Sequence, residues 1–212
     1  MSDFSTRRVM MVDTQVRPSD VTKFPIIAAM LNVPREAFVP VAQREAAYVG
    51  LNLTLAPGRV VLEARTLAKL LDFLDIQPGD RVMDLGSGYG YAAAVLTEMG
   101  AEVVAVEEDA VMADTARAHL PGVTVVTGPL QAGAAHHGPY DAIVVQGAVE
   151  QVPEAILAQL KDGGRIGALF MQGALGTARI GLHQDGKVAW RSVFNATAPV
   201  LPGFAARRDF VL

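Results

Sequence analysis

The chain has 212 residues, 51% of them hydrophobic and 19% charged, and carries a formal net charge of −4 at pH 7. This composition excludes a disordered chain, and the length is enough for one domain with a full core. The apolar stretches are interrupted well short of the ~20 residues that span a bilayer, so no membrane partner is expected. The negative charge does not favour a nucleic-acid partner, which usually needs a basic face. The absence of cysteine excludes disulfides and cysteine-ligated zinc, and is compatible with a cytoplasmic protein.

The N-terminal part of the chain is predicted to be helical. Its first residues include the basic pair Arg7-Arg8 but lack the apolar core and cleavage site of a signal peptide. We therefore expect a flexible, solvated start without a targeting role. Asp20 is expected to cap a helix over residues 21–31. An amphipathic helix is predicted over residues 62–74, where leucines recur at helical spacing.

After residue 75, short valine-rich runs alternate with helical stretches. Runs of this length, separated by helices, are typical of a parallel sheet covered on both faces. The predicted strands are residues 81–85, 102–106, 123–126, 142–145 and 165–170, and the predicted helices are residues 91–99, 110–120 and 153–160. Further on, runs 178–183 and 188–195 flank Asp185-Gly186, a strong hairpin signal, and residues 209–212 are predicted as a final strand.

Together these elements predict an α/β fold, a Rossmann-like, doubly wound, mainly parallel sheet with antiparallel C-terminal strands and an N-terminal helical extension. Residues 1–75 are expected to pack on residues 76–212 within one structural domain, with their helices lying across the ligand crevice. Ligands of such sheets bind outside the carboxyl ends of the strands. Strands 82–85 and 142–145 are therefore expected to be parallel neighbours beside the site.

The most informative segment is residues 84–90, which read Asp-Leu-Gly-Ser-Gly-Tyr-Gly. These glycines lie between a predicted strand and a predicted helix, where a ligand must approach the backbone closely. About 20 residues further on, Glu107 ends the next predicted strand, where an acid can accept hydrogen bonds from a ribose diol. This setting predicts a nucleotide-like cofactor rather than a plain glycine turn.

Two cofactor classes compete for this loop. A dinucleotide pyrophosphate prefers Gly-x-Gly-x-x-Gly, whereas Tyr91 stands here at the place of the third glycine. Asp84 would repel a pyrophosphate but suits the ammonium group of S-adenosyl-L-methionine, which is the predicted cofactor; a nicotinamide-dependent oxidoreductase is the less favoured class. The predicted contacts are Asp84, Gly86, Ser87, Gly88, Tyr89 and Gly90 for the methionine part, Glu107 for the ribose, and Glu108 and Leu130 for adenine.

Several segments together resemble the protein-L-isoaspartate O-methyltransferase family. They are residues 82–90, the Pro-Arg-Glu-Ala-Phe-Val-Pro run at 34–40, Ala47-Tyr48, residues 140–145, and the Gln-Leu-Lys-Asp-Gly-Gly-Arg run at 159–165. The resemblance runs from about residue 21 to residue 170. It implies a methyltransferase that uses S-adenosyl-L-methionine to esterify the free carboxylate of isoaspartyl residues in damaged proteins. The implied partner is thus a protein or peptide with a free carboxylate.

Two positions depart from that family's pattern. The family's Ser-Gln-Pro, whose serine hydroxyl lies at the reaction site, corresponds here to a segment that begins Leu62-Glu63. The family's Gly-Asp-Gly, whose aspartate is associated with adenine, corresponds to residues 128–130, which read Gly-Pro-Leu. An apolar side chain at Leu62 cannot donate to a substrate oxygen, so no catalytic residue is assigned and the repair activity is expected to be weak or absent. Glu63 is a candidate for contacting a cationic substrate, or an acid favoured at a helix N-terminus.

Other interpretations stay open. A methyltransferase for another acceptor, or a non-catalytic protein that binds S-adenosyl-L-methionine, would share the same loop. A carboxylate acceptor, with a pKa of about 4, needs no general base, so the lack of an obvious base does not separate them. His136-His137 lacks a third ligand at suitable spacing, and no metal site is predicted. We expect a monomer or a small homo-oligomer.

Overall fold

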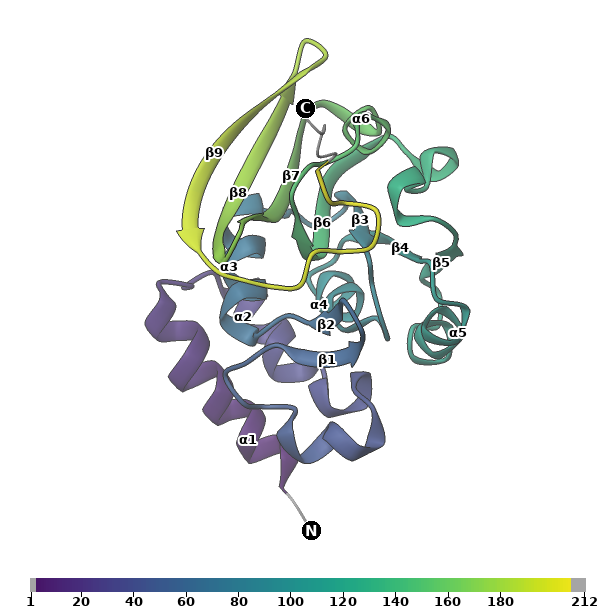
Figure 1. Ribbon diagram of the computed structural model, residues 1–212. Helices are drawn as coiled ribbons and strands as arrows, with labels where there is room; N and C mark the ends of the chain where they lie inside the picture. The colour runs from purple at the N-terminus through teal and green to yellow at the C-terminus, as the bar shows by residue number, and fades with distance from the viewer. Residues whose placement is uncertain (1–2, 207–212) are drawn as a thin grey trace.

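The computed structural model describes residues 3–206, and over this range the chain builds a seven-stranded sheet with helices packed against it (Figure 1). The strand order is β5-β4-β3-β6-β7-β8-β9. The strands of this sheet are β3 (Arg81–Leu85), β4 (Glu102–Glu107), β5 (Thr124–Thr127), β6 (Tyr140–Val149), β7 (Leu160–Gln172), β8 (Leu175–Gln184) and β9 (Lys187–Asn195). The helices are α1 (Phe4–Met11), α2 (Phe24–Asn32), α3 (Ala64–Leu74), α4 (Tyr91–Glu98), α5 (Ala110–His119) and α6 (Glu154–Leu157).

The parallel half of the sheet follows the predicted alternation of strands and helices. β3 pairs in parallel with β4 on one side and with β6 on the other, with Val82 opposite Ala142. Alternate residues of these strands belong to two separate hydrophobic clusters, because successive side chains of a strand point to opposite faces. Both faces are therefore covered, as the valine-rich runs predicted, and the doubly wound arrangement is confirmed.

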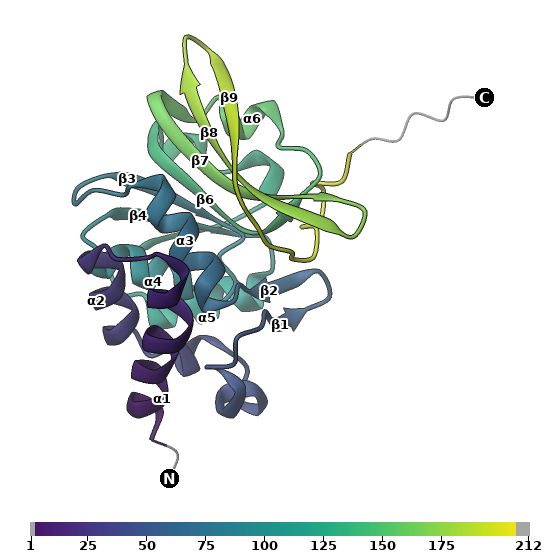
Figure 2. The ribbon, with the colours of Figure 1, turned by 90° about the vertical axis from the view of Figure 1, so that its left-hand side faces the viewer.

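The C-terminal half of the sheet is antiparallel, and Figure 2 shows β8 and β9 as a long hairpin rising from the sheet. The hairpin turns at Asp185 (φ 51°) and Gly186 (φ 74°), the left-handed pair that a tight two-residue turn requires. The predicted hairpin is thus confirmed, with both strands longer than expected. The strand predicted over residues 209–212 lies outside the described residues.

For residues 3–8, the expectation of a flexible, solvated start is wrong. Asp3 caps α1 by accepting hydrogen bonds from the backbone N–H groups of Ser5 and Thr6. Arg8 is half-buried and donates to the Tyr48 hydroxyl at 3.0 Å and to the Glu36 carboxylate at 3.3 Å. Tyr48 and Glu36, about 30 to 40 residues away along the chain, thus hold this segment in place. The local sequence pattern does not predict such distant partners.

The start of the next helix also differs from the prediction. Asp20 does not cap it, since its own backbone is left-handed (φ 65°) and it ends a short 3-10 turn. α2 begins three residues later than expected, at Phe24, with Pro25 in its first turn, where a missing N–H costs nothing.

The part of the first 75 residues that reaches the ligand crevice is a hairpin rather than a helix. α2 packs on α4, and α3 packs on β7, so the helices lie beside the sheet. β1 (Leu53–Ala56) and β2 (Arg59–Val61) form a separate two-stranded sheet that contacts β6 (Figure 1). In the described part of the chain, no helix is long and apolar enough to cross a membrane.

Candidate functional site

A glycine loop joins the end of β3 to the start of α4, at the carboxyl edge of the parallel strands. Gly86, Gly88 and Gly90 have φ values of 79°, 57° and 94°, a region that residues with a β-carbon rarely adopt. Gly90 caps α4, and a β-carbon there would lie 2.5 Å from Leu120. Gly90 is therefore needed for packing, while Gly86 and Gly88 face the crevice side, toward the β1–β2 hairpin and the C-terminal segment.

Asp84 is fully buried at the end of β3. Its Oδ1 accepts a hydrogen bond of 2.8 Å from the Gln146 side-chain amide. Among the described residues, Oδ2 has no hydrogen bond of good geometry, although the Ala93 backbone N–H is close enough to favour the ionised form. Burial dominates and raises the pKa of Asp84 to about 7. The Ser87 hydroxyl is likewise buried without a partner in the described residues, so the loop holds two polar atoms able to meet a ligand.

Glu107 ends β4 and is fully buried beside the glycine loop. Its Oε2 accepts from the Gly88 backbone N–H at 2.7 Å, and its Oε1 from the Asp109 backbone N–H at 3.0 Å. The Arg59 guanidinium adds a bidentate ion pair, with Nη1 donating to Oε1 at 2.6 Å and Nη2 donating to Oε2. Glu107 lies beside the glycine loop, as the sequence predicted, whereas Arg59 was not among the predicted residues.

Arg59 begins β2 and is only 4% exposed. The sequence offers no local signal for this burial, because Arg81 also directly precedes an apolar run and its side chain is 44% exposed. The partner carboxylate, Glu107, lies 48 residues away and is likewise not identified by the sequence.

Leu62 and Glu63, which replace the first two residues of the family's Ser-Gln-Pro, have different surroundings in the structure. The Leu62 side chain is 1% exposed and belongs to the hydrophobic core, while its backbone carbonyl accepts from the buried Arg35 guanidinium. Glu63 stands at the start of α3, but its carboxylate does not cap the helix; it accepts from Arg65 and from the Thr66 hydroxyl.

The remaining residues predicted to contact the cofactor differ in their burial. Leu130 is buried in the same cluster as Leu85 and Leu201, on the crevice side of β3. Glu108 and Tyr89 are half-buried. Tyr91 instead packs under the Arg35 guanidinium, whose carbon lies 4.7 Å from the ring centroid. In the described residues, no group of three or more histidine, aspartate or glutamate side chains could hold a metal ion.

The chain's own side chains lie directly on the glycine loop. A β-carbon built at Gly86 would lie 3.4 Å from Leu201 and 3.5 Å from Arg59, and one at Gly88 would lie 2.5 Å from Leu55. Leu201 belongs to residues 196–206, here called the C-terminal strap, which crosses in front of the sheet after β9 (Figure 1). The strap is held by the Leu201 N–H, which donates to the Ala148 carbonyl at 2.8 Å.

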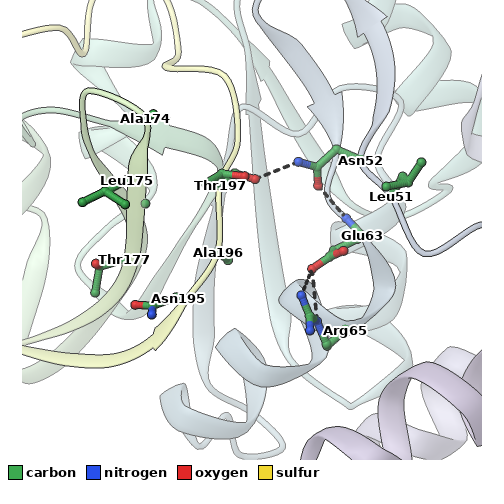
Figure 3. Close-up of a pocket in the computed structure, with 11 residues that line it drawn as sticks. Leu51, Asn52, Glu63, Arg65, Ala174, Leu175, Thr177, Asn195, Ala196 and Thr197 are labelled. Carbon is green, nitrogen blue, oxygen red and sulfur yellow. Dashed lines mark hydrogen bonds and ion pairs between the residues drawn. The ribbon is translucent and has the colours of Figure 1, made fainter.

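A cavity of about 510 Å³ lies between the β1–β2 region and the end of the C-terminal hairpin (Figure 3). One wall carries Asn52, Glu63 and Arg65, and the other carries polar side chains of β8, β9 and the strap. The side chains of Leu51 and Leu175, exposed by 66% and 77%, stand at its edges. Polar walls with apolar edges suit a polypeptide segment better than a purely apolar ligand.

Asn52 joins the two walls of this cavity. Its side-chain N–H donates to the Thr197 carbonyl at 2.8 Å, and its side-chain oxygen accepts from the Glu63 backbone N–H at 2.9 Å (Figure 3). Both walls continue toward the glycine loop, one through β1 and β2 to Arg59 and the other through the strap to Leu201. The cavity and the loop are thus connected by two segments of the chain.

The sequence is similar to a known family over most of its length. Residues 8–187 match the family model described as protein-L-isoaspartate(D-aspartate) O-methyltransferase. A protein-L-isoaspartate O-methyltransferase of Methylorubrum extorquens is 40% identical over 171 residues, which are 77% of this chain and 74% of that protein. A protein of the same name from Staphylothermus marinus is 33% identical over 201 residues, covering 86% of this chain and 89% of that protein.

Solved structures share the fold. A protein-L-isoaspartate O-methyltransferase superposes with a TM-score of 0.78 at 23% identity, over 94% of this chain and 66% of that one. A Plasmodium falciparum structure described as a beta-aspartate methyltransferase in complex with S-adenosyl-L-homocysteine has a TM-score of 0.74 at 15% identity, over 95% of this chain and 99% of that one. At these identities the likeness supports the architecture alone.

Proposed function

Because the chain belongs to the protein-L-isoaspartate O-methyltransferase family, we propose that it transfers a methyl group from S-adenosyl-L-methionine to the free carboxylate of isoaspartyl residues in proteins. The observation that carries this proposal is the glycine loop flanked by two buried carboxylates, Asp84 and Glu107. A positively charged amino acid joined to a ribose has groups that match both acids, whereas a pyrophosphate matches neither.

The residues around the loop fit this cofactor. The free Oδ2 of Asp84 suits the cofactor's ammonium group, and Glu107 suits its ribose hydroxyls. Gly86 and Gly88 add no side chain beside the backbone, where Arg59, Leu201 and Leu55 now lie, and the buried Ser87 hydroxyl offers a further polar contact. When bound, the cofactor supplies an electrophilic methyl group and a neutral thioether as leaving group. The Plasmodium falciparum structure, which shares this architecture, is described as a complex with S-adenosyl-L-homocysteine.

The 510 Å³ cavity is the proposed place for the acceptor polypeptide. An acceptor carboxylate with a pKa of about 4 is already ionised at neutral pH, so the protein has to orient it and exclude water rather than remove a proton. Arg65 and Asn52 supply donors at the cavity wall for this task. The main contribution of the protein to the rate is therefore positioning.

The presence of leucine at position 62 supports a low rate of methyl transfer. Its side chain is packed in the core and carries no donor for a substrate oxygen. A donor there would orient the acceptor carboxylate, and the loss of such alignment can cost on the order of 10²-fold in rate. We propose that the activity is real but weak compared with relatives that carry serine at this position.

A methyl-transfer assay with tritiated cofactor tests this function. An isoaspartyl peptide should accept base-labile methyl groups, while the matched aspartyl peptide should not. Calorimetric titration with S-adenosyl-L-homocysteine should show binding, and titration with NADH should not. Binding without transfer to the isoaspartyl peptide would instead support another acceptor or a binding role, and binding of NADH alone would support an oxidoreductase.

Three broader properties are proposals as well. We propose that the protein acts in the cytoplasm as a monomer or small homo-oligomer, without a nucleic-acid partner. Cell fractionation checks the location, and light scattering checks the oligomeric state. A large assembly in solution would contradict the proposed oligomeric state.

A further inference from the structure

Glu107 has no acceptor capacity left for a ribose. An ionised carboxylate offers about four lone-pair positions, and four N–H donors point at this one. Two come from the Arg59 guanidinium and two from the backbone of Gly88 and Asp109. A ribose diol that binds Glu107 therefore has to displace some of these donors.

Only one of the three donor residues is free to leave. The Gly88 N–H belongs to the glycine loop, whose backbone is tied to β4 by the Gly86 and Ser87 N–H groups donating to the Val106 carbonyl. Asp109 caps α5 with its side chain, so its backbone is fixed by the start of that helix. Arg59 reaches Glu107 by its side chain alone, and side chains change rotamer far more readily than capped backbone does.

The same guanidinium also occupies space beside the loop. Its Nη2 lies 3.5 Å from the place where a β-carbon would stand at Gly86, beside the δ-carbons of Leu201. The room that these glycines leave next to the backbone is thus taken by side chains of β2 and of the C-terminal strap.

We propose that Arg59 is a positioning residue that holds Glu107 in a closed state and competes with the ribose of S-adenosyl-L-methionine for it. This inference rests on the proposed function, since it concerns the same cofactor. Cofactor binding then carries the cost of separating a buried, bidentate ion pair. Affinity for the cofactor is accordingly set by Arg59 as well as by the groups that touch the cofactor.

The test is calorimetric titration with S-adenosyl-L-homocysteine of the unaltered protein, Arg59→Gln, Arg59→Lys and the control Arg81→Gln. Arg59→Gln should bind about tenfold more tightly or better, because charge-assisted hydrogen bonds no longer have to be broken. Arg59→Lys, which keeps the charge but loses the bidentate geometry, should lie between. Arg81→Gln changes a different arginine–glutamate pair, which joins β3 to the opposite end of β4, and should leave affinity unchanged.

A second measurement follows the ion pair in the unaltered protein and needs one folded Arg59 variant only to assign the resonance. The side-chain N–H resonance of Arg59, assigned by its loss in Arg59→Lys or Arg59→Gln, should shift on titration with S-adenosyl-L-homocysteine as the ion pair separates. Unchanged or weaker binding by Arg59→Gln, with an unmoved Arg59 resonance in the bound protein, would overturn the proposal. Failure of every form to bind S-adenosyl-L-homocysteine would instead contradict the proposed function.

Discussion

Two arginine–glutamate pairs lie at opposite ends of β4, and they differ in almost every physical respect. At the amino end Arg81 pairs with Glu102 at 3.1 Å, with side chains 44% and 65% exposed. At the carboxyl end Arg59 pairs with Glu107, with side chains 5% and 0% exposed. The first pair connects adjacent strands in water, while the second joins β2 to β4 inside the protein.

The difference shows how burial increases the energetic cost of separating an ion pair. Exposed pairs contribute about 0–1 kcal/mol, because water and salt screen them. A buried pair has already lost its hydration, so removing one partner leaves an uncompensated charge. The carboxyl end of β4 is also where ligands of this fold bind, so the proposed role in cofactor binding concerns the buried pair.

The largest expected effect is that of Glu107→Ala on stability. The substitution leaves the Arg59 guanidinium buried without its carboxylate, and the free energy of unfolding should fall by about 3–5 kcal/mol. Urea denaturation measures the change, with Glu107→Gln as a variant that preserves the shape of the side chain. A loss no greater than that of an exposed glutamate would show that the pair is not buried in solution.

An intermediate effect concerns Asp84, the other buried carboxylate at this edge. Burial raises its pKa from 3.8 to about 7, so the folded protein binds this proton more tightly than the unfolded chain does. The associated stability is present in full below pH ~4 and is lost as the pH rises through 7; the free energy of unfolding should fall by about 1 kcal/mol between pH 6 and pH 8. Affinity for S-adenosyl-L-homocysteine should rise over the same window, because the ionised acid attracts the ammonium group.

Denaturation at several pH values, with Asp84→Asn as the matched variant, separates this contribution from other titrations. Asparagine keeps the shape but does not ionise, so the slope between pH 6 and pH 8 should become flatter. An identical slope in both proteins would assign the pH dependence to a different group.

The smallest effect is expected at the amino end of β4. Glu102→Ala should change the free energy of unfolding by less than about 1 kcal/mol, and added salt should shrink the difference further. Denaturation at low and high ionic strength measures it. A loss as large as that for Glu107→Ala would remove the contrast between the two ends.

Prediction from the sequence succeeded where a short pattern is enough. The residues of β3 were predicted exactly because an apolar run stops at glycines, and the hairpin turn at Asp185 follows from residues that adopt left-handed backbone. It failed at the N-terminus, where Arg8 finds partners about 30 to 40 residues away, and at Asp20, whose side chain suits a cap but whose backbone is left-handed. Local preference is overruled there by distant contacts.

The sequence by itself determined the parallel sheet, the glycine loop and the two acids beside it, since periodicity and the strand–loop–helix order are local properties. Only the tertiary structure decided that Arg59 meets Glu107, that Leu201 lies against Gly86, and that Leu62 points into the core. Those contacts join segments 48 and more than 100 residues apart along the chain. The packing of the layers decides which charged side chains form pairs and which side chain fills a crevice. The residues adjacent in sequence do not encode these contacts.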